Sequence, residues 1–438
     1  MAGEVCLGEV AEIIMGQSPP GETYNQNGQG LPFFQGVADF NYRHPTPRVY
    51  CTAPSRIAEQ GDILLSVRAP IGRVNVADRQ CAIGRGLSII RPRNRGDGRY
   101  LEFALRAKQA EWGAIEGGGS VFGNATRKDL ERLVVSWPFR AAERRAIAHI
   151  LGTLDDKIEL NRRMSETLEA MARALFKAWF VDFEPVRAKI EGRWKRGESL
   201  PGLPAHLYDL FPDRLIDSEL GEIPEGWEVE ELGDLVVTIK GRSYKSEELV
   251  ESDTALVTLK SFARGGGYRP DGLKSFAGTY KEEQVVNPGE VVIACTDVTQ
   301  AAEVIGRPVI VRETGRYRRL VASLDTLIIR PHDSRMTRAF LYFLAGTEAF
   351  FAHTYAHTTG TTVLHLAKQA VSSFLFARPS KQLVQLFDAT ATRALDRIQA
   401  LDKDSETLAA LRDTLLPKLI SGELRVKDAE TFLERVAV

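Results

Sequence analysis

The sequence predicts an α/β fold in which two α/β domains are separated by two long helices. We expect the helices to form an antiparallel coiled coil and the chain to be a tandem pseudo-two-fold repeat. Three observations support this prediction: a coiled-coil period in one stretch, a second copy of that stretch, and landmarks that recur in the same order. The predicted boundaries are residues 1–139 and 229–379 for the domains, 140–183 for the central helix, 184–228 for a connector, and 380–438 for the C-terminal helix and tail.

The first long helix is predicted between Glu143 and Asp182. Apolar and small residues recur there at alternating intervals of four and three, which keeps one seam on one side of a helix. The seam consists of Ile147, Leu151, Leu154, Ile158, Asn161, Ser165, Leu168, Ala172, Leu175 and Trp179. A single exposed helix cannot bury such a seam, so a partner helix is expected.

The second long helix repeats the first at an offset of 240 residues. Ser165-Glu166-Thr167-Leu168 recurs as Ser405-Glu406-Thr407-Leu408, and Ile158 and Leu175 map onto Ile398 and Leu415. The economical arrangement is that the two helices pack against each other. The polar seam residues Asn161, Ser165 and Ser405 are then expected to fix register rather than to carry chemistry.

The ends of the second helix have their own signals. Ser380 is expected to cap its start and Gly422 to end it, while Pro417 should kink or shorten its last turns.

The two domains share landmarks, while their loops differ in length. The matching pairs are Gly16-Gln17-Ser18 with Gly241-Arg242-Ser243, Gly61-Asp62-Ile63-Leu64 with Gly289-Glu290-Val291-Val292, and Ile89-Ile90-Arg91-Pro92 with Ile328-Ile329-Arg330-Pro331. Within the first domain, residues 63–67 and 87–90 are predicted strands and residues 100–115 a helix. One scaffold with divergent loops is therefore expected in both domains.

Charge is concentrated locally, although the net charge of the 438 residues is −1. Residues 43–106 contain twelve arginines, no lysine and five acidic residues, a local excess of +7. Such a segment can face phosphates, and the alternative is that its arginines are spread over a solvated surface.

Cysteines and apolar runs indicate the compartment. The four cysteines, Cys6, Cys51, Cys81 and Cys295, lack CxxC spacing, so neither a zinc site nor a disulfide framework is expected. No signal peptide and no apolar run of about 20 residues is present. A cytoplasmic protein without membrane contact is predicted.

Enzyme signatures are missing from the sequence. It contains no phosphate-loop motif, no Asn-Pro-Pro-aromatic tetrapeptide of amino-methyltransferases and no dinucleotide fingerprint. His353 and His357, with His365 nearby, could bring metal ligands together, but the glutamate of HExxH is missing. We therefore expect neither catalytic activity nor a metal.

Four strings in the duplicated chain carry a family resemblance. They are GDILLSVRAPIG at residues 61–72, LFKAWFVDFEP at 175–185, DSELGEIPEGW at 217–227 and LLPKLISGEL at 415–424. In this order, they resemble the specificity subunit of a type I restriction-modification system, and the resemblance covers essentially the whole chain.

The resemblance implies a non-catalytic subunit that binds double-stranded DNA. In this family, each of two target-recognition domains reads one half of a bipartite, asymmetric site. Two methylation subunits bind the chain, and two restriction subunits can join them. No cofactor of its own is implied, since S-adenosylmethionine belongs to the methylation subunits. A coiled-coil protein–protein scaffold without DNA recognition stays open as an alternative, and salt-dependent duplex binding would distinguish the two.

Candidate DNA contacts in the first domain are loop residues. Arg68 and Arg73 flank a turn containing Pro70, and Arg85 lies between two glycines that allow close approach to a phosphate or a guanine edge. Other loop residues able to read base edges are Gln17, Gln35, Asn41 and Arg43.

The second domain departs from the first at the Arg68 turn. Thr296 to Gln300 replace Arg68 to Gly72, so the role of Arg68 does not carry over. The candidate DNA contacts there are instead Lys240, Arg242, Tyr244, Lys245, Lys260, Arg264, Arg269, Arg318 and Arg319.

Overall fold

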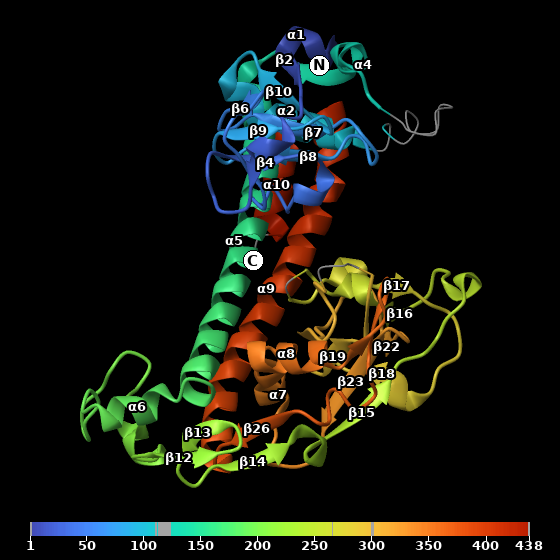
Figure 1. The fold of residues 1–438 in the computed structure, drawn as a ribbon. Coiled ribbons are helices and arrows are strands. Elements are labelled where there is room, and N and C mark those ends of the chain that lie inside the picture. The colour runs from blue at the N-terminus through green and yellow to red at the C-terminus, as the bar shows by residue number, and fades with distance from the viewer. Residues whose placement is uncertain (1, 110–111, 113–123, 265, 299–301, 437–438) are drawn as a thin grey trace. The chain divides into compact units, whose positions relative to one another are not determined.

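Two long helices, α5 (Ala141–Phe180) and α9 (Lys381–Ser421), run through the computed structural model (Figure 1). The structure describes residues 2–109, 112, 124–264, 266–298 and 302–436. Its contacts divide the chain into unit 1, residues 1–161 and 404–438, and unit 2, residues 162–403. Each unit therefore contains one half of α5 and one half of α9.

In unit 1 the two helix halves run antiparallel. Asp155 pairs with Arg412 at 2.7 Å, and the side-chain amide of Asn161 donates to Asp404 at 2.8 Å. Residue numbers on α9 therefore fall as residue numbers on α5 rise. Asn161 also donates to Ser405 Oγ at 3.2 Å. These two predicted polar seam residues thus contact each other.

In unit 2 the halves meet through aromatic side chains. The rings of Phe176 and Phe180 lie 5.2 Å and 5.5 Å from the ring of Phe387, and Ala172 and Ala391 belong to the same buried cluster.

The ends of α9 agree with the sequence except at Pro417. Ser380 Oγ accepts from the backbone N–H of Leu383, and Gly422 has a left-handed φ of 78° just beyond the last turn. Pro417 does not shorten α9, which continues to Ser421, and the alternative that it kinks the last turns stays a prediction. The proline is exposed, while neighbouring Leu419 is buried, and burial of each such side chain contributes roughly 1.5–3 kcal/mol against the ~3 kcal/mol cost of an interior proline.

The remaining elements of unit 1 precede α5, except for α10 at the C-terminus. Its helices are α1 (Leu7–Val10), α2 (Gly98–Ala107), α4 (Arg127–Arg132) and α10 (Val426–Val436). Its strands are β1 (Ala2–Cys6), β2 (Ala11–Met15), β3 (Tyr24–Asn25), β4 (Leu31–Phe34), β5 (Tyr50–Cys51), β6 (Ile57–Ala58), β7 (Ile63–Ser66), β8 (Val74–Val76), β9 (Cys81–Ile83), β10 (Leu87–Pro92) and β11 (Val134–Pro138).

The remaining elements of unit 2 lie between the two long helices in sequence. Its helices are α6 (Glu184–Ile190), α7 (Arg338–Ala345) and α8 (Glu348–Ala356). Its strands are β12 (Leu215–Ser218), β13 (Gly221–Pro224), β14 (Glu228–Glu231), β15 (Val236–Lys240), β16 (Thr254–Val257), β17 (Lys274–Ser275), β18 (Val285–Val286), β19 (Val291–Ala294), β20 (Thr296–Asp297), β21 (Pro308–Ile310), β22 (Arg319–Ala322), β23 (Thr326–Pro331), β24 (Thr358–Thr359), β25 (Leu364–Leu366) and β26 (Leu375–Arg378).

Both units contain a four-stranded antiparallel sheet with the same order of corresponding strands. The order is β2-β10-β7-β8 in unit 1 and β15-β23-β19-β21 in unit 2. Beside it, a parallel pair recurs as β4 with β9 and as β16 with β22. The predicted strands over residues 63–67 and 87–90 are confirmed as β7 and β10.

An ion pair recurs at one end of the two central strands of these sheets. Asp62 is fully buried and pairs with Arg91 at 2.6 Å, and Glu290 pairs with Arg330 at 2.7 Å. These acidic and basic residues belong to the sequence landmarks that the two domains share. The same ion pair therefore forms in both units.

The helix predicted over residues 100–115 is seen as α2, and its end at 110–111 and 113–115 lies outside the described residues. The connector segment packs Trp194, Leu207 and Phe211 into the same buried cluster as Trp179 of α5.

Within the described chain, no helix is both long and apolar enough to cross a membrane.

Candidate nucleic-acid interface

A small cavity of about 160 Å³ in unit 1 brings three predicted DNA contacts together. Gln35, Arg68 and Arg85 all line it, although they lie on three separate loops and all three are exposed. The rest of its lining is Ser18, Gly36, Val37, Ala69 and Gly86. Ser18 was not singled out as a contact, although it belongs to the landmark Gly16-Gln17-Ser18.

Tight backbone turns position these side chains. Arg68 follows β7, whose last residue, Ser66, accepts from the backbone N–H of Arg73 at 2.9 Å and so ties the two ends of the loop together. Arg85 is in the turn between β9 and β10. A Cβ on the following Gly86 would lie 2.1 Å from the carbonyl oxygen of Gln35, so only glycine lets the two loops approach.

The cavity is cationic. Arg85 Nε donates to Ser18 Oγ at 3.3 Å. Among the residues that the structure describes, no carboxylate pairs with Arg68 or Arg85. Two guanidinium groups beside a carboxamide can donate to guanine O6 and N7 or to phosphate, and the Gln35 amide can match adenine.

The other predicted contacts of unit 1 lie elsewhere. Gln17, Asn41 and Arg73 are exposed but do not line this cavity. Asn41 is held locally through Thr46 Oγ1 at 3.3 Å. Arg43 points into the protein and pairs with the buried Glu102 at 3.1 Å, so its charge is already neutralised.

The corresponding turn of unit 2, between β22 and β23, has the same backbone hydrogen bonds. In unit 1 the amide of Gly16 donates to Leu87 O, that of Gln17 to Ile83 O and that of Val67 to Gly86 O. In unit 2 the amide of Gly241 donates to Thr326 O, that of Arg242 to Ala322 O and that of Cys295 to Asp325 O. The two turns can therefore be matched residue by residue.

The matched side chains differ in chemistry. Thr296 takes the place of Arg68, Leu324 that of Arg85 and Thr258 that of Gln35. Leu324 is 42% exposed, an apolar group where unit 1 has a cation. Asp297, next to Thr296, is fully buried and accepts from the backbone N–H of Val304 at 2.7 Å, so it supports the loop.

Four of the predicted cations of unit 2 form ion pairs. Arg242 pairs with Glu248, Arg264 with Glu303, Arg269 with Asp271 and Arg319 with Glu282. Tyr244 is half-buried, and its hydroxyl accepts from Lys274 at 3.4 Å. The side chains of Lys240, Lys245, Lys260 and Arg318 are exposed.

Two of these cations share a larger hollow before β22. A cavity of about 620 Å³ is lined by Arg318 and Arg319 together with Arg316, which the sequence reasoning missed. The guanidinium of Arg316 lies 5.1 Å from the ring centre of Tyr317, also in the lining. The run of three arginines around one tyrosine was the signal that could have found it. An aromatic ring among arginines suits a phosphate backbone or a stacked base.

The three histidines do not form one cluster. The rings of His353 and His357 lie 4.4 Å apart, and His353 Nε2 bonds Ser373 Oγ at 3.1 Å, while His365 is on β25. The described part of the chain contains no group of three or more His, Cys, Asp or Glu residues that could hold a metal.

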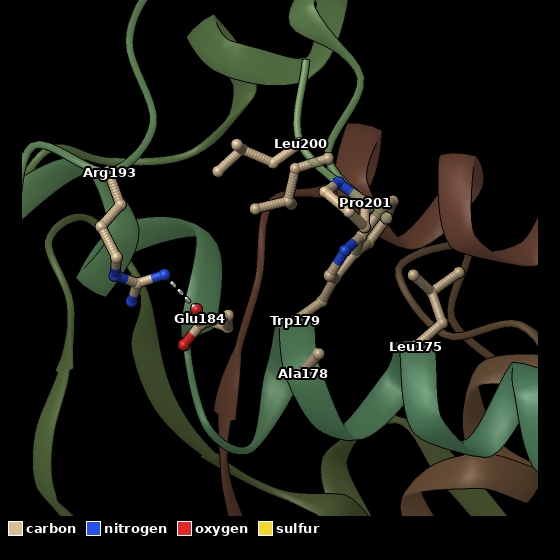
Figure 2. A pocket seen from close by; sticks show the side chains of 9 residues that line it. Leu175, Ala178, Trp179, Glu184, Arg193, Leu200 and Pro201 are labelled. Carbon is tan, nitrogen blue, oxygen red and sulfur yellow. Dashed lines mark hydrogen bonds and ion pairs between the residues drawn. The ribbon is translucent and has the colours of Figure 1, made fainter. Parts of the chain in front are cut away.

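A pocket of different character lies in unit 2 at the end of α5 (Figure 2). Its volume is about 350 Å³, and Leu175, Trp179, Leu200 and Pro201 project into it, while the Glu184–Arg193 ion pair of 2.7 Å lies at one side. The mostly apolar lining does not suit DNA, but it suits an apolar side chain of a protein.

Comparison with known proteins connects this geometry to a family. Residues 2–170 match the model of the type I restriction modification DNA specificity domain. Two relatives come from Methanocaldococcus jannaschii. The type I restriction enzyme MjaIX specificity subunit is 25% identical over 96% of this chain and 93% of its own length. The MjaX specificity subunit is 40% identical over 36% of this chain, which spans only 37% of that relative.

A third relative, the type I restriction enzyme HindI specificity subunit of Haemophilus influenzae, is 23% identical over 70% of this chain and 73% of its own length. Among solved structures, the HsdS subunit from Thermoanaerobacter tengcongensis is 46% identical over 34% of this chain and 36% of that chain, with a TM-score of 0.31. The type I S subunit from M. genitalium is 14% identical over 96% of both chains, with a TM-score of 0.49. These TM-scores are low, so the assignment rests on the sequence matches. Over almost its whole length the chain is thus similar to type I restriction-modification specificity subunits, and its residues 2–170 match their DNA specificity domain.

Proposed function

We propose that this chain is the non-catalytic DNA reader of a type I restriction-modification complex and that its two target-recognition domains each read one half of a bipartite, asymmetric site. The first domain reads through the cavity lined by Gln35, Arg68 and Arg85. The second reads with a different set of side chains. The long helices pair as an antiparallel coiled coil and hold the two readers at a fixed spacing.

One observation carries this proposal. Two corresponding turns have the same backbone hydrogen bonds, while Arg68 and Arg85 of the first are replaced by Thr296 and Leu324 in the second. Sequence is read by side chains at base edges, whereas the backbone only positions them. A constant frame with changed side chains therefore supports two readers with different targets.

The helices also supply candidate contacts for protein partners. On α5, Met171 is 64% exposed and lies one turn before Leu175, which lines the apolar pocket of Figure 2. Exposed apolar groups beside an apolar pocket are typical of protein interfaces. We propose that methylation subunits dock here, that S-adenosylmethionine is bound by them rather than by this chain, and that restriction subunits can join.

The test is an exchange of one domain. Residues 229–379 are replaced by the corresponding domain of a relative, and the chain is expressed with its methylation subunits. We expect one half of the methylated sequence to change and the other half to stay. A change in both halves would contradict independent readers.

Duplex binding by the wild-type complex addresses the scaffold alternative. A complex whose wild-type chain binds random and target duplexes equally at every salt concentration would favour a scaffold without DNA recognition. Methyl transfer by the purified chain alone, at a stoichiometry that excludes a contaminant, would contradict the non-catalytic role.

A further inference from the structure

A buried carboxylate joins three separate parts of unit 1. Asp155 of α5 is fully buried, and it accepts hydrogen bonds from Arg106 of α2 at 2.5 Å, Arg412 of α9 at 2.7 Å and the Tyr42 hydroxyl at 3.0 Å. Arg412 also donates to the Tyr42 oxygen at 2.7 Å. The contact therefore connects a loop and a helix of the α/β domain with both long helices.

The network extends to a second buried carboxylate, Glu102. Its side chain is 2% exposed and pairs with Arg106 at 2.7 Å, Arg43 at 3.1 Å and Arg99 at 3.4 Å. Arg99 then reaches Asp156 on the exposed side of α5 at 2.7 Å. The facing groups are the arginines Arg43, Arg99, Arg106 and Arg412 and the carboxylates Glu102, Asp155, Asp156 and Asp413. Charges of both signs are thus balanced.

A second ionic anchor lies near the point where the domain joins α5. Arg144 pairs with Asp97 through bonds of 2.8 Å and 2.9 Å, and both side chains are nearly fully buried. Arg144 precedes Asp155 by eleven residues, which corresponds to roughly 16 Å along a helix. The domain and α5 also share a buried apolar cluster that includes Phe103 and Leu151, and the two ionic anchors add directional contacts at both ends of this interface.

Charge at the far anchor is retained in the folded state. Burial raises the pKa of the Asp155 carboxyl, but the charge of Arg106 and the bonds from Arg412 more than offset this, so its pKa lies below the ordinary value. Buried ionic networks often add little net stability compared with apolar packing of similar volume, and their attested benefit is a defined arrangement. Orientation is thus the better explanation for this network.

We propose that the Asp155 network fixes the tilt of the first target-recognition domain on the helix pair and thereby selects the spacer length between the two half-sites. Asp155 and Arg412 are positioning residues in this account, since they act through the domain and do not touch DNA. The inference rests on the proposed function, because a spacer exists only if two half-sites are read.

The test compares two neighbouring substitutions in the full complex. Asp155→Asn removes the buried charge. Asp156→Asn makes the same change at the rim of the network, where the side chain is 66% exposed and its partner Arg99 keeps Glu102 and the Gly152 carbonyl oxygen as acceptors. Methylated sites are mapped in cells that express each variant with its methylation subunits. For Asp155→Asn we expect sites with a spacer one base pair longer or shorter to gain methylation by roughly tenfold, with both half-site sequences unchanged. Asp156→Asn should keep the original spacer.

Two further variants separate orientation from folding. Asp155→Asn combined with Arg412→Gln removes charges of both signs and should restore part of the spacer selectivity. Tyr42→Phe deletes one hydroxyl only and should relax the spacer in the same direction, and it decides the question if Asp155→Asn does not assemble.

Three outcomes would overturn the inference: an assembled Asp155→Asn complex that keeps a single spacer, an equal loss of methylation at all sites that parallels a fall in melting temperature, or the same relaxation in Asp156→Asn. A wild-type complex that methylates no bipartite site would instead contradict the proposed function.

Discussion

Arg85 of unit 1 and Leu324 of unit 2 occupy the same position in two turns whose backbone hydrogen bonds match. In unit 1 the turn borders a cavity with a second arginine, Arg68. In unit 2 the position of Arg68 is taken by Thr296, and a cluster of arginines, Arg316, Arg318 and Arg319, lies instead at the start of β22. Exposed arginines therefore lie at opposite ends of two corresponding strands, after β9 in unit 1 and at the start of β22 in unit 2.

The contrast separates framework residues from reading residues. Asp62 and Glu290 are buried at corresponding positions, and each forms an ion pair with an arginine on a central strand of its sheet. Arg85 and Leu324 are exposed, so their substitution costs the fold little. Exposed positions can change while the buried ones keep the geometry, which is how one scaffold can present two different surfaces.

The largest expected effect comes from changing the helices that both regions share. Inserting two residues after Leu168 rotates the following seam by about 200°, so apolar positions turn to solvent and activity or solubility is lost. Inserting four residues adds about 6 Å and rotates the seam by only about 40°, which coiled coils accommodate. Mapping of methylated sites should then show both half-sites unchanged and the spacer one or two base pairs longer. An active four-residue variant with the original spacer would show that the helices do not set the distance.

The two corresponding ion pairs, Asp62–Arg91 and Glu290–Arg330, test whether the two sheets are stabilised equally. Asp62→Ala leaves the partly buried guanidinium of Arg91 without its 2.6 Å partner, and loss of such a hydrogen-bonded partner costs about 1–3 kcal/mol. Glu290→Ala should cost less, because Arg330 keeps the carbonyl oxygens of Glu283 and Val285 as acceptors at 3.0 Å and 2.6 Å. Urea unfolding gives the magnitudes, and hydrogen exchange at β7 and β19 locates the loss. Equal costs would show that the backbone acceptors contribute nothing.

Substitutions at the two corresponding turn residues, Arg85 and Leu324, test which turn contacts DNA. Arg85→Ala should weaken duplex binding by the complex by roughly 1–3 kcal/mol if the guanidinium contacts a base through two bonds. Leu324→Ala, at the corresponding residue, should change affinity by less than about 0.5 kcal/mol. Titration at several salt concentrations measures both, and Arg68→Ala should resemble Arg85→Ala. Unaltered affinity in folded Arg85→Ala and Arg68→Ala would assign these arginines to solvated surface.

The smallest effect should come from giving unit 2 the cation of unit 1. Leu324→Arg adds one positive charge at an exposed turn, so the slope of log affinity against log salt should steepen by about 0.9 if a phosphate is within reach. Leu324→Gln, a polar control without charge, should leave the slope unchanged. The same slope for Leu324→Arg as for wild type would place this turn away from the duplex.

The sequence alone accounts for the framework because its signals are local or repeated. The alternation of threes and fours along residues 143–182 identified the helix seen as α5, and Ser380 and Gly422 marked the ends of α9. The matched strings around Gly61 and Gly289 indicated one scaffold, and the two sheets have the same strand order. Periodicity, caps and turn residues act within a few residues, so they can be read without the fold.

The tertiary structure decided which candidate side chains can act together. Arg43 and Arg68 looked alike in sequence, but Arg43 meets Glu102, 59 residues away, while Arg68 opens onto the cavity with Arg85. Nothing in the sequence marks Asp155 as a member of a network, because its partner Arg412 lies 257 residues further along the chain. Whether a charge is paired depends on long-range packing, and side-chain type alone carries no information about the partner that packing brings near.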